Sequence, residues 1–196
     1  MKNSVNRKKR SPGALMIAAA IVIMGFSALA ADNEKDSRAD DIKAVFVYKF
    51  TGYITWPEDD DKPFTIAILG KTSLLEPLKT IAEKKTVDTR PLLIRECSNV
   101  DDVSGANILL IAETMEKHLE AILKKAEEEN ILTVGSSPGL AKKGVAINFC
   151  PMEDRIGFEM NLNALKRSGL GVSSQLVKLA KLVEEDRPRD AGGELK

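Results

Sequence analysis

Few side chains in this sequence have the types and spacing that catalysis requires. His118 is the only histidine, and its place between Lys117 and the apolar Leu119 favours a surface position. No second His or Cys lies at a metal-ligand spacing, and no Ser or Cys has a histidine partner for nucleophilic attack. The Gly-Lys-Thr run at 70–72 is too short for a phosphate-binding loop. We therefore expect no enzymatic activity, no metal and no cofactor.

A polar row on a late strand is the first candidate binding site. Arg155, Glu159 and Asn161 recur with the period of two that places side chains on one face of a β-strand, while positions 156, 158 and 160 are apolar. A guanidinium, a carboxylate and an amide on one surface suit a polar ligand or a protein partner. The sequence leaves open the alternative that this is the solvated face of an edge strand.

The loop after the apolar run at 131–134 is the second candidate site. Ligands of open α/β sheets bind beyond the carboxyl ends of the strands, where Ser136, Ser137 and Gly139 would lie. An ordinary polar turn would have the same composition, and this alternative also stays open. Together with Arg155, the loop predicts a small-molecule pocket at the strand ends as a second functional hypothesis.

These candidates depend on an alternation of strands and helices along the chain. Short apolar or alternating runs predict strands, and a period of 3.6 residues predicts helices between them. The expected strands are 64–69, 91–95, 107–111, 131–134, 145–149 and 155–161, and the expected helices are 40–56, 74–84, 113–130 and 162–185. This order predicts a single three-layer α/β sandwich, with a largely parallel sheet, a C-terminal antiparallel hairpin and flanking helices.

Apolar residues at helical spacing also predict which helix faces are buried. In the first helix the expected core stripe is Ile42, Val45, Phe46, Phe50 and Tyr53. In the last helical region it is Val172, Leu176, Leu179, Ala180 and Val183.

The N-terminus has the pattern of a secretory signal peptide. A basic stretch at 1–10 precedes an apolar run at 14–30 that ends in Ala-Leu-Ala. We expect residues 1–30 to be a signal peptide cleaved near Ala30, with an uncleaved membrane anchor as the alternative. Residues 31–39 are expected to form a flexible tail, residues 40–185 the α/β domain, and residues 186–196 a disordered tail.

The charge of the exported body limits the class of partner. The chain holds 29 basic and 29 acidic residues, and five of the basic ones but none of the acidic ones lie in residues 1–10. A chain that starts at residue 31 would thus keep 24 basic residues against 29 acidic ones, a net charge of −5. A mildly acidic body argues against nucleic acid as a partner.

Cys97 and Cys150 are the two cysteines of the chain. Because an exported protein meets an oxidising compartment, the pair could form a disulfide. The alternative is two free thiols that pack as small apolar side chains. A lone pair has no spacing signature that decides between them.

An ordered set of motifs resembles the YfiR-like family of periplasmic regulators. The motifs cover nearly the whole chain after the leader: residues 42–57, 64–70, 90–91, 138–141, 147–149, 155–162 and 173–180. The sequence departs from the family pattern at Lys49, where Asn is common, and at Thr89, where Gly is usual. It also has two cysteines in place of the four that form two disulfides in the best-known member of the family, so at most one bridge can form within this chain and the redox control of that member is not carried over.

The resemblance implies a role and further site residues. YfiR-like proteins are periplasmic and are not known as enzymes. The best-known member of the family binds the periplasmic domain of an inner-membrane diguanylate cyclase and holds it inactive, and so acts on cyclic di-GMP signalling and biofilm formation; an outer-membrane partner can relieve the inhibition. The resemblance therefore implies that this chain controls a membrane-bound signalling protein, either a diguanylate cyclase or a sensor kinase. The resemblance implies a homodimer, strengthens the case for the Arg155 row, and adds Asn148, Ser174 and Gln175 as candidate binding residues.

Overall fold

The computed structural model describes residues 36–57, 62–153 and 155–186. The chain divides into two compact units, Met1–Ala39 and Asp40–Lys196, and the fold described below is that of the second. The predicted signal peptide at 1–30 lies outside the described residues. So do all of the predicted C-terminal tail except Asp186, and all of the N-terminal tail before residue 36.

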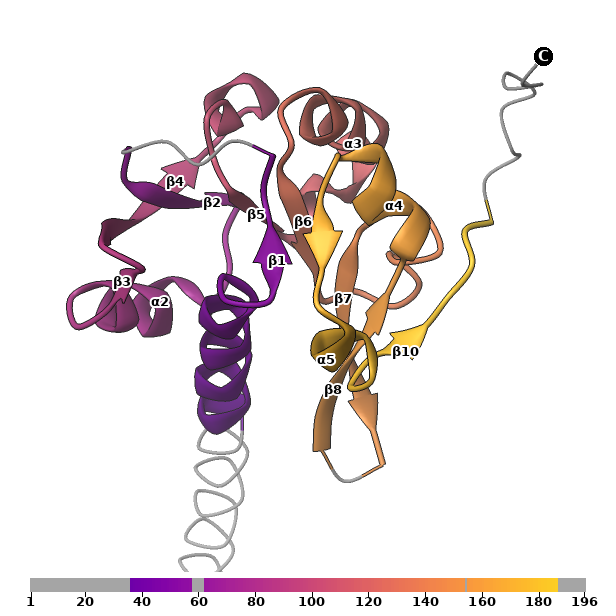
Figure 1. Cartoon of the computed structure of the whole chain (residues 1–196), viewed down its shortest axis with the longest axis horizontal. Helices are drawn as coiled ribbons and strands as arrows, with labels where there is room; N and C mark the ends of the chain where they lie inside the picture. The colour runs from indigo at the N-terminus through magenta and orange to yellow at the C-terminus, as the bar shows by residue number, and fades with distance from the viewer. Residues whose placement is uncertain (1–35, 58–61, 154, 187–196) are drawn as a thin grey trace, which may run out of the picture. The chain divides into compact units, whose positions relative to one another are not determined.

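An eight-stranded sheet forms the centre of the domain (Figure 1). Neighbouring strands pair in parallel except β7 with β8 and β3 with β4, which are antiparallel. In spatial order the strands are β10 (Lys181–Leu182), β8 (Arg155–Met160), β7 (Ile147–Met152), β6 (Leu132–Gly135), β5 (Ile108–Ile111), β2 (Phe64–Leu69), β4 (Arg90–Cys97) and β3 (Thr86–Val87). The predicted α/β class, the largely parallel sheet and the antiparallel hairpin are confirmed.

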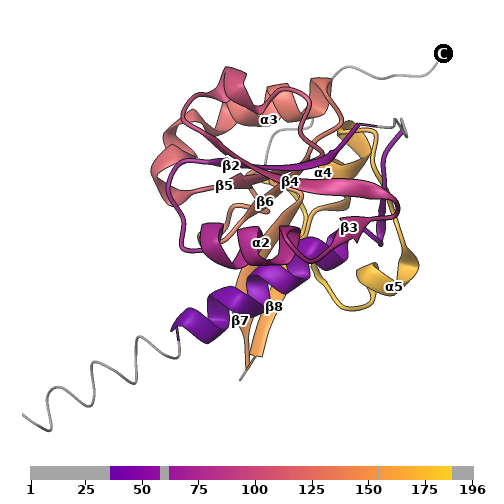
Figure 2. The same ribbon diagram turned by 90° about the vertical axis from the view of Figure 1, so that its left-hand side faces the viewer.

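Helices cover both faces of the sheet, as Figure 2 shows with the sheet close to edge-on. One face carries α2 (Leu75–Ala82) and the first helix of the domain, residues 40–50, and the other carries α3 (Leu119–Glu128). The remaining elements are α4 (Leu162–Arg167), α5 (Ser174–Val177), the 3-10 helices η1 (Val100–Val103) and η2 (Glu113–His118), and a small antiparallel sheet of β1 (Ile54–Thr55) and β9 (Gly171–Val172). The three-layer prediction is therefore correct.

The central strands β2, β5 and β6 are buried along their whole length. Burial on both faces explains why their sequences are continuous apolar runs rather than alternating ones. Aromatic packing fixes the first helix to the hairpin of β7 and β8. The rings of Phe50 and Phe158 meet edge to face at 5.3 Å between centroids, and Phe50 stacks on Phe149 at 6.1 Å.

The predicted burial of the first helix is only partly correct. Ala44, Val47 and Phe50 are fully buried, whereas Ile42 is 47% and Val45 48% exposed. The apolar arc of this helix is wider than the stripe that packs on the sheet, and the buried stripe is centred on Ala44, Val47 and Phe50. The outer part of the arc is open on the described domain.

The predicted helices at 113–130 and 162–185 are both interrupted. The first begins as the 3-10 helix η2 and becomes α-helical only at Leu119. In the second, α4 ends before Gly169, whose φ of +64° stops the helix. The chain then forms β9, α5 and β10 in turn. Of the expected core stripe there, Leu176 is buried but Leu179 is 60% exposed.

Candidate functional site

A crevice of about 230 Å³ opens at the carboxyl ends of β2, β5 and β6. Its floor is apolar, with Leu74, Leu110, Val134 and Phe149, and its rim is polar. The rim residues are Lys71, Thr72, Ser73, Glu113 and Ser136. An apolar floor with a few polar groups at the mouth is typical of a small-molecule site.

The strand order gives this position a topological reason. The chain leaves β2 through α2 and reaches β4 on one side, whereas it leaves β5 through α3 and reaches β6 on the other side. The two helices pack on opposite faces, since Leu78 of α2 and Ile122 of α3 belong to separate cores. The crevice between β2 and β5 is thus a switch point of the sheet, where ligands of α/β proteins bind.

Gly70 shapes the first rim loop of the crevice. It directly follows β2 and has a φ of +88°, a conformation that other residues rarely adopt. A Cβ atom there would lie 2.8 Å from Cγ of Met115 and 3.0 Å from Cβ of Ala112. Glycine therefore allows the loop after β2 to lie tightly against the loop after β5. In the loop after β2, the Thr72 hydroxyl accepts a hydrogen bond from the Leu74 N–H at 3.3 Å, just before α2 begins.

The predicted loop residues lie beside the crevice to different extents. Ser136 lines the crevice and is exposed, in agreement with its predicted place at a strand end. Ser137 and Gly139 are half-buried and lie outside the residues that line it. They belong to a turn in which the Ser137 carbonyl accepts from the Leu140 N–H at 3.4 Å and Gly139 has a φ of +80°. Their local role is to form this turn.

Asn148 of β7 lies behind the crevice and is 1% exposed. Neither its Oδ1 nor its Nδ2 atom has a hydrogen-bond partner among the described residues. Gly135, which lines the crevice, is so close that a Cβ atom on it would lie 3.2 Å from the Asn148 Oδ1 atom. A buried amide with no protein partner commonly marks a bound water, a ligand or a functional position.

Glu159 lies opposite Asn148 in the hairpin register and is buried. Its carboxylate pairs with Lys181 of β10, with 3.1 Å between Oε1 and Nζ. Cys150 lies on the same face of β7, and burial, followed by the negative charge of Glu159, raises the pKa of its thiol. A thiol with a raised pKa stays protonated at neutral pH and is a poor nucleophile.

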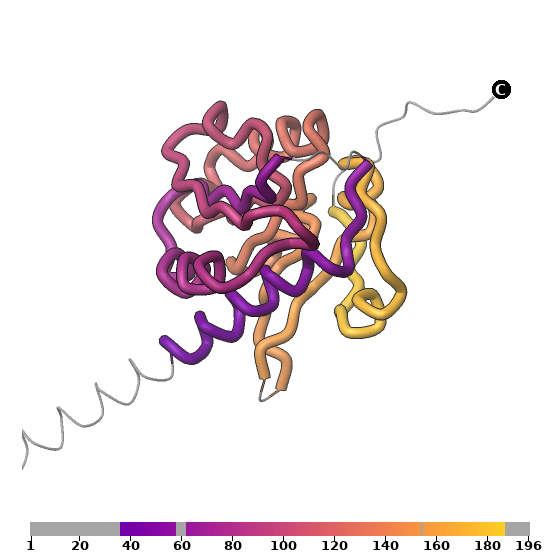
Figure 3. The backbone as a smooth tube through the Cα atoms, turned by 60° about the vertical axis from the view of Figure 1, so that its left-hand side comes forward, coloured from indigo at the N-terminus to yellow at the C-terminus, as the bar shows by residue number. Residues whose placement is uncertain are grey.

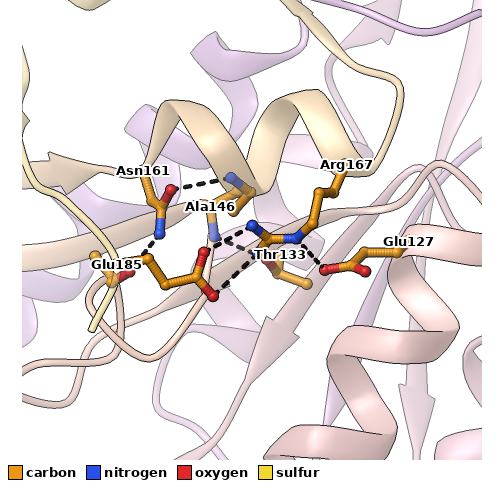
Figure 4. A network of polar contacts seen from close by, with 8 residues as sticks. Glu127, Thr133, Ala146, Asn161, Arg167 and Glu185 are labelled. Carbon is orange, nitrogen blue, oxygen red and sulfur yellow. Dashed lines mark hydrogen bonds and ion pairs between the residues drawn. The ribbon is translucent and has the colours of Figure 1, made fainter. Parts of the chain in front are cut away.

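Asn161 has a structural position, shown in Figure 4. It is fully buried and is the N-cap of α4, where its Oδ1 atom accepts from the Ala164 N–H at 2.9 Å. Its Nδ2 atom donates to the Ala141 carbonyl at 2.8 Å. Both ends of the amide are thus used within the fold, and this residue fastens α4 to the turn after β6.

A second network in Figure 4 holds the C-terminal segment. The Nε atom of Arg167 in α4 donates to Oε1 of Glu127 in α3 at 2.7 Å. Its two terminal nitrogens donate to the two carboxylate oxygens of Glu185 at 2.7 and 3.1 Å. Burial lowers the pKa of Arg167, but the two carboxylates outweigh it and raise the pKa overall. The Val183 N–H also donates to the Met160 carbonyl at 3.0 Å. Residues 181–186 are therefore tied directly to α4 and β8.

Arg155 does not join the other two residues of its predicted row. It is exposed at the start of β8, in the hairpin that Figure 3 shows projecting beyond the neighbouring strands. Four residues of extended chain separate it from Glu159, about 13 Å at 3.3 Å per residue. The structure brings Asn148 and Glu159 together and leaves Arg155 outside. Ser174 and Gln175 are exposed on α5, far along the chain from either group.

The structure does not join the two cysteines. Both are free thiols, Cys97 buried at the end of β4 and Cys150 half-buried in β7. Three strands, β2, β5 and β6, lie between them in the sheet. Four interstrand steps amount to about 19 Å, whereas a disulfide requires Cα atoms within about 7 Å. The disulfide that the sequence analysis left open as one alternative therefore does not fit the arrangement of the strands. Burial raises the pKa of the Cys97 thiol.

Sequence reasoning missed Lys71, Glu113 and Lys181. Lys71 and Glu113 lie two residues after the predicted strands 64–69 and 107–111, so the strand-end rule applied to Ser136 could also have found them. Lys181 could not have been found, because its segment was expected to be helical. Among residues 36–57, 62–153 and 155–186, no group of three His, Cys, Asp or Glu side chains could hold a metal. No helix in the same ranges has the length and hydrophobicity to span a bilayer.

The fold is an α/β domain with a crevice at the ends of its central strands. The chain belongs to the YfiR/HmsC-like family, whose model matches residues 40–181. This result confirms the resemblance seen in the sequence motifs, and it supports the expectation of a periplasmic regulator. A search of curated proteins finds no match.

Several solved structures resemble part of the domain. One is the ligand-free, open form of a substrate binding protein with adhesive properties from Clostridium difficile (15% identity, TM-score 0.48, 63% of this chain and 55% of that chain). A second is an ABC domain in complex with L-Trp from Streptococcus pneumonia (11% identity, TM-score 0.46, 61% of this chain and 55% of that chain). A third is a conserved domain protein from Vibrio cholerae (14% identity, TM-score 0.46, 60% of this chain and 54% of that chain). The chain spans little more than half the length of each of these proteins.

Proposed function

We propose that this chain is a non-enzymatic periplasmic protein that controls a membrane-bound signalling protein, a diguanylate cyclase or a sensor kinase, by binding its outer domain. The observation that carries the proposal is the family match over residues 40–181. A small domain of this kind can act by binding one of two states of its partner more tightly than the other. An outer-membrane protein that captures the regulator would then relieve the control.

Deletion of the gene in its host tests this role. Loss of the regulator should change cellular cyclic di-GMP and biofilm formation, and the intact gene should restore both. A matched control lacks residues 1–30, so that the same domain stays in the cytosol; it should fail to complement. Affinity capture from envelope extracts should recover an inner-membrane signalling protein. Unchanged cyclic di-GMP and biofilm together with no captured membrane protein would reject the role.

A second function, small-molecule binding, is favoured by the crevice at the switch point. The crevice joins an apolar floor to Lys71, Glu113 and the hydroxyl of Ser136. The unpaired amide of Asn148 lies directly behind it. This arrangement suits a small ligand that carries both polar and apolar groups.

Thermal-shift screening of nucleotides and amino acids tests the second function. A ligand of the crevice should raise the melting temperature of the wild-type protein. It should not do so for Ser136→Trp, which fills the crevice from an exposed position. Ser98→Trp places the same side chain at an exposed position away from the crevice and serves as the control. A flat screen would remove the support for this function.

A further inference from the structure

The outer edge of β8 is only partly covered. On one side β8 pairs with β7 along its whole length, from Arg155 to Met160. On the other side β10 pairs only with Glu159 and Met160, and β10 is the last strand on that side of the sheet (Figure 1). No described strand lies beside residues 155–158 on this side. An uncovered edge of this kind is a template for the addition of another strand.

The backbone groups of this edge alternate along β8. The Met160 carbonyl accepts a hydrogen bond from the Val183 N–H at 3.0 Å, so residue 160 directs its backbone groups toward β10. Because a strand repeats every two residues, Phe158 and Ile156 direct theirs to the same edge. The whole edge is about 20 Å long, and β10 covers only the end of it at residues 159 and 160. A longer extended segment would therefore find more of the ladder available than β10 uses.

Residues 181–186, here called the edge segment, bury little apolar surface. Lys181 and Leu182 are exposed, Leu182 by 51%, and Val183 is only half-buried. Backbone bonds and ion pairs hold the segment instead; the Asp186 N–H, for example, donates to the Lys142 carbonyl at 2.9 Å. A segment with few buried apolar contacts opens locally at a low cost in free energy.

Two ion pairs fix the register of the edge segment. Lys181 pairs with Glu159 at 3.1 Å, and Glu185 accepts two hydrogen bonds from Arg167, at 2.7 and 3.1 Å. The side chain of Glu159 is only 12% exposed. When the segment leaves, this carboxylate stays behind in a largely buried position without its cation, which is unfavourable. The edge therefore favours a replacement that brings a basic residue to Glu159 and, four residues later, a carboxylate to Arg167.

We propose that the outer edge of β8 binds an extended segment of a partner protein by strand addition, and that the edge segment occupies this site until the partner displaces it. The partner segment runs parallel to β8. It carries a basic residue opposite Glu159, an acidic residue four positions later, and β-forming residues beside 155–158. The proposal is independent of the proposed regulatory function, because strand addition can be measured on the purified protein.

Hydrogen exchange tests whether the edge segment opens separately from the rest of the domain. In the naturally processed protein, Glu185→Lys should speed exchange of the Val183 amide about tenfold, because the bonds to Arg167 become a repulsion. Glu184→Lys makes the same charge change at an exposed neighbour; it is the matched control and should stay within about twofold of wild type. The Leu110 amide in β5 should exchange at the wild-type rate in both variants. Equal exchange at Val183 in the two variants, or an equal acceleration at Leu110, would overturn the proposal.

Peptide binding tests the chemistry of the partner. The probe is the fluorescent peptide TVTVKLVEED, which joins a β-forming stretch to a copy of the edge segment. By fluorescence anisotropy it should bind the Glu185→Lys protein about tenfold more tightly than the Glu184→Lys protein, whose edge stays occupied. The peptide TVTVKLVEKD offers a lysine to Arg167 and should bind more weakly by about tenfold. The short peptide KLVEED should also bind more weakly, because it lacks the part that lies beside residues 155–158.

The position of the bound peptide decides between the outcomes. The amide resonances of Ile156 and Phe158 should shift when TVTVKLVEED binds. The proposal is overturned if the peptide binds both proteins equally, if the long and short peptides bind equally, or if these two resonances do not change. A dimer of the Glu185→Lys protein in sedimentation, formed by exchange of edge segments and without peptide binding, would assign the edge to a second copy and would also overturn it.

Discussion

Replacing Asn161 by alanine removes two buried hydrogen bonds at once. The cap bond to the Ala164 N–H and the bond to the Ala141 carbonyl measure 2.9 and 2.8 Å, and the side chain is fully buried. Loss of an N-cap costs about 1 kcal/mol. The Ala141 carbonyl keeps a bond from the Gly144 N–H at 3.2 Å, so loss of the second bond costs about 1 kcal/mol more. We therefore expect Asn161→Ala to lower the free energy of unfolding by about 2 kcal/mol.

Urea denaturation, followed by circular dichroism, measures this loss as a change in midpoint at constant slope. Asn163→Ala is the matched control, because Asn163 is exposed on the same helix, and it should stay within about 0.5 kcal/mol of wild type. Asn161→Asp should fall between the two at neutral pH, since it keeps the cap acceptor but presents a carboxylate to the Ala141 carbonyl. If Asn161→Ala costs no more than Asn163→Ala, the assignment of Asn161 to fold stability is wrong.

Three further predictions follow from single contacts. Hydrogen bonds and the nearby ammonium outweigh burial and lower the pKa of Glu129; its carboxylate therefore stabilises the fold above the unfolded pKa of about 4.3 and loses this effect as pH falls. Urea midpoints of Glu129→Gln should thus lie below wild type at pH 7, and the gap should close near pH 3. Gly135→Ala should cost about 1–3 kcal/mol, because its Cβ would lie 2.6 Å from the Leu140 Cδ1 atom in the core; thermal melts would show this, and an unchanged melt would contradict it. Unreduced, denatured monomer should react with two equivalents of a thiol reagent, one each for Cys97 and Cys150, and a count of zero would contradict the strand separation.

The sequence predicted the regular part of the fold well, for a physical reason. Strands β2, β5 and β6 are buried on both faces, so their apolar runs are long enough to be recognised without knowledge of the neighbours. The hairpin of β7 and β8 was equally clear from its alternating pattern, although residues 147–149 and 157–160 are buried on both faces of the hairpin. Local pattern is sufficient where burial is uniform along an element.

The parts that the sequence did not predict depend on contacts between distant segments. Residues 181–182 became a strand because the edge of β8 was available to them. Ile42 and Val45 have the spacing of core residues but are exposed, because the sheet covers only part of the apolar side of the first helix. The predicted polar row of Arg155, Glu159 and Asn161 depends on distant contacts in the same way. Asn161 caps a helix and Glu159 pairs with Lys181, and the alternating pattern of the strand does not show these partners.

The pairing of β1 with β9 joins the two ends of the domain. Ile54, just after the first helix, lies opposite Val172. An apolar groove likewise combines Val45 of that helix with Leu179 near the end of the chain. A growing or truncated polypeptide that stops before residue 170 has the helix but not the groove. Any partner that recognises this surface would therefore distinguish finished molecules from fragments, and association would begin only after synthesis and folding are complete.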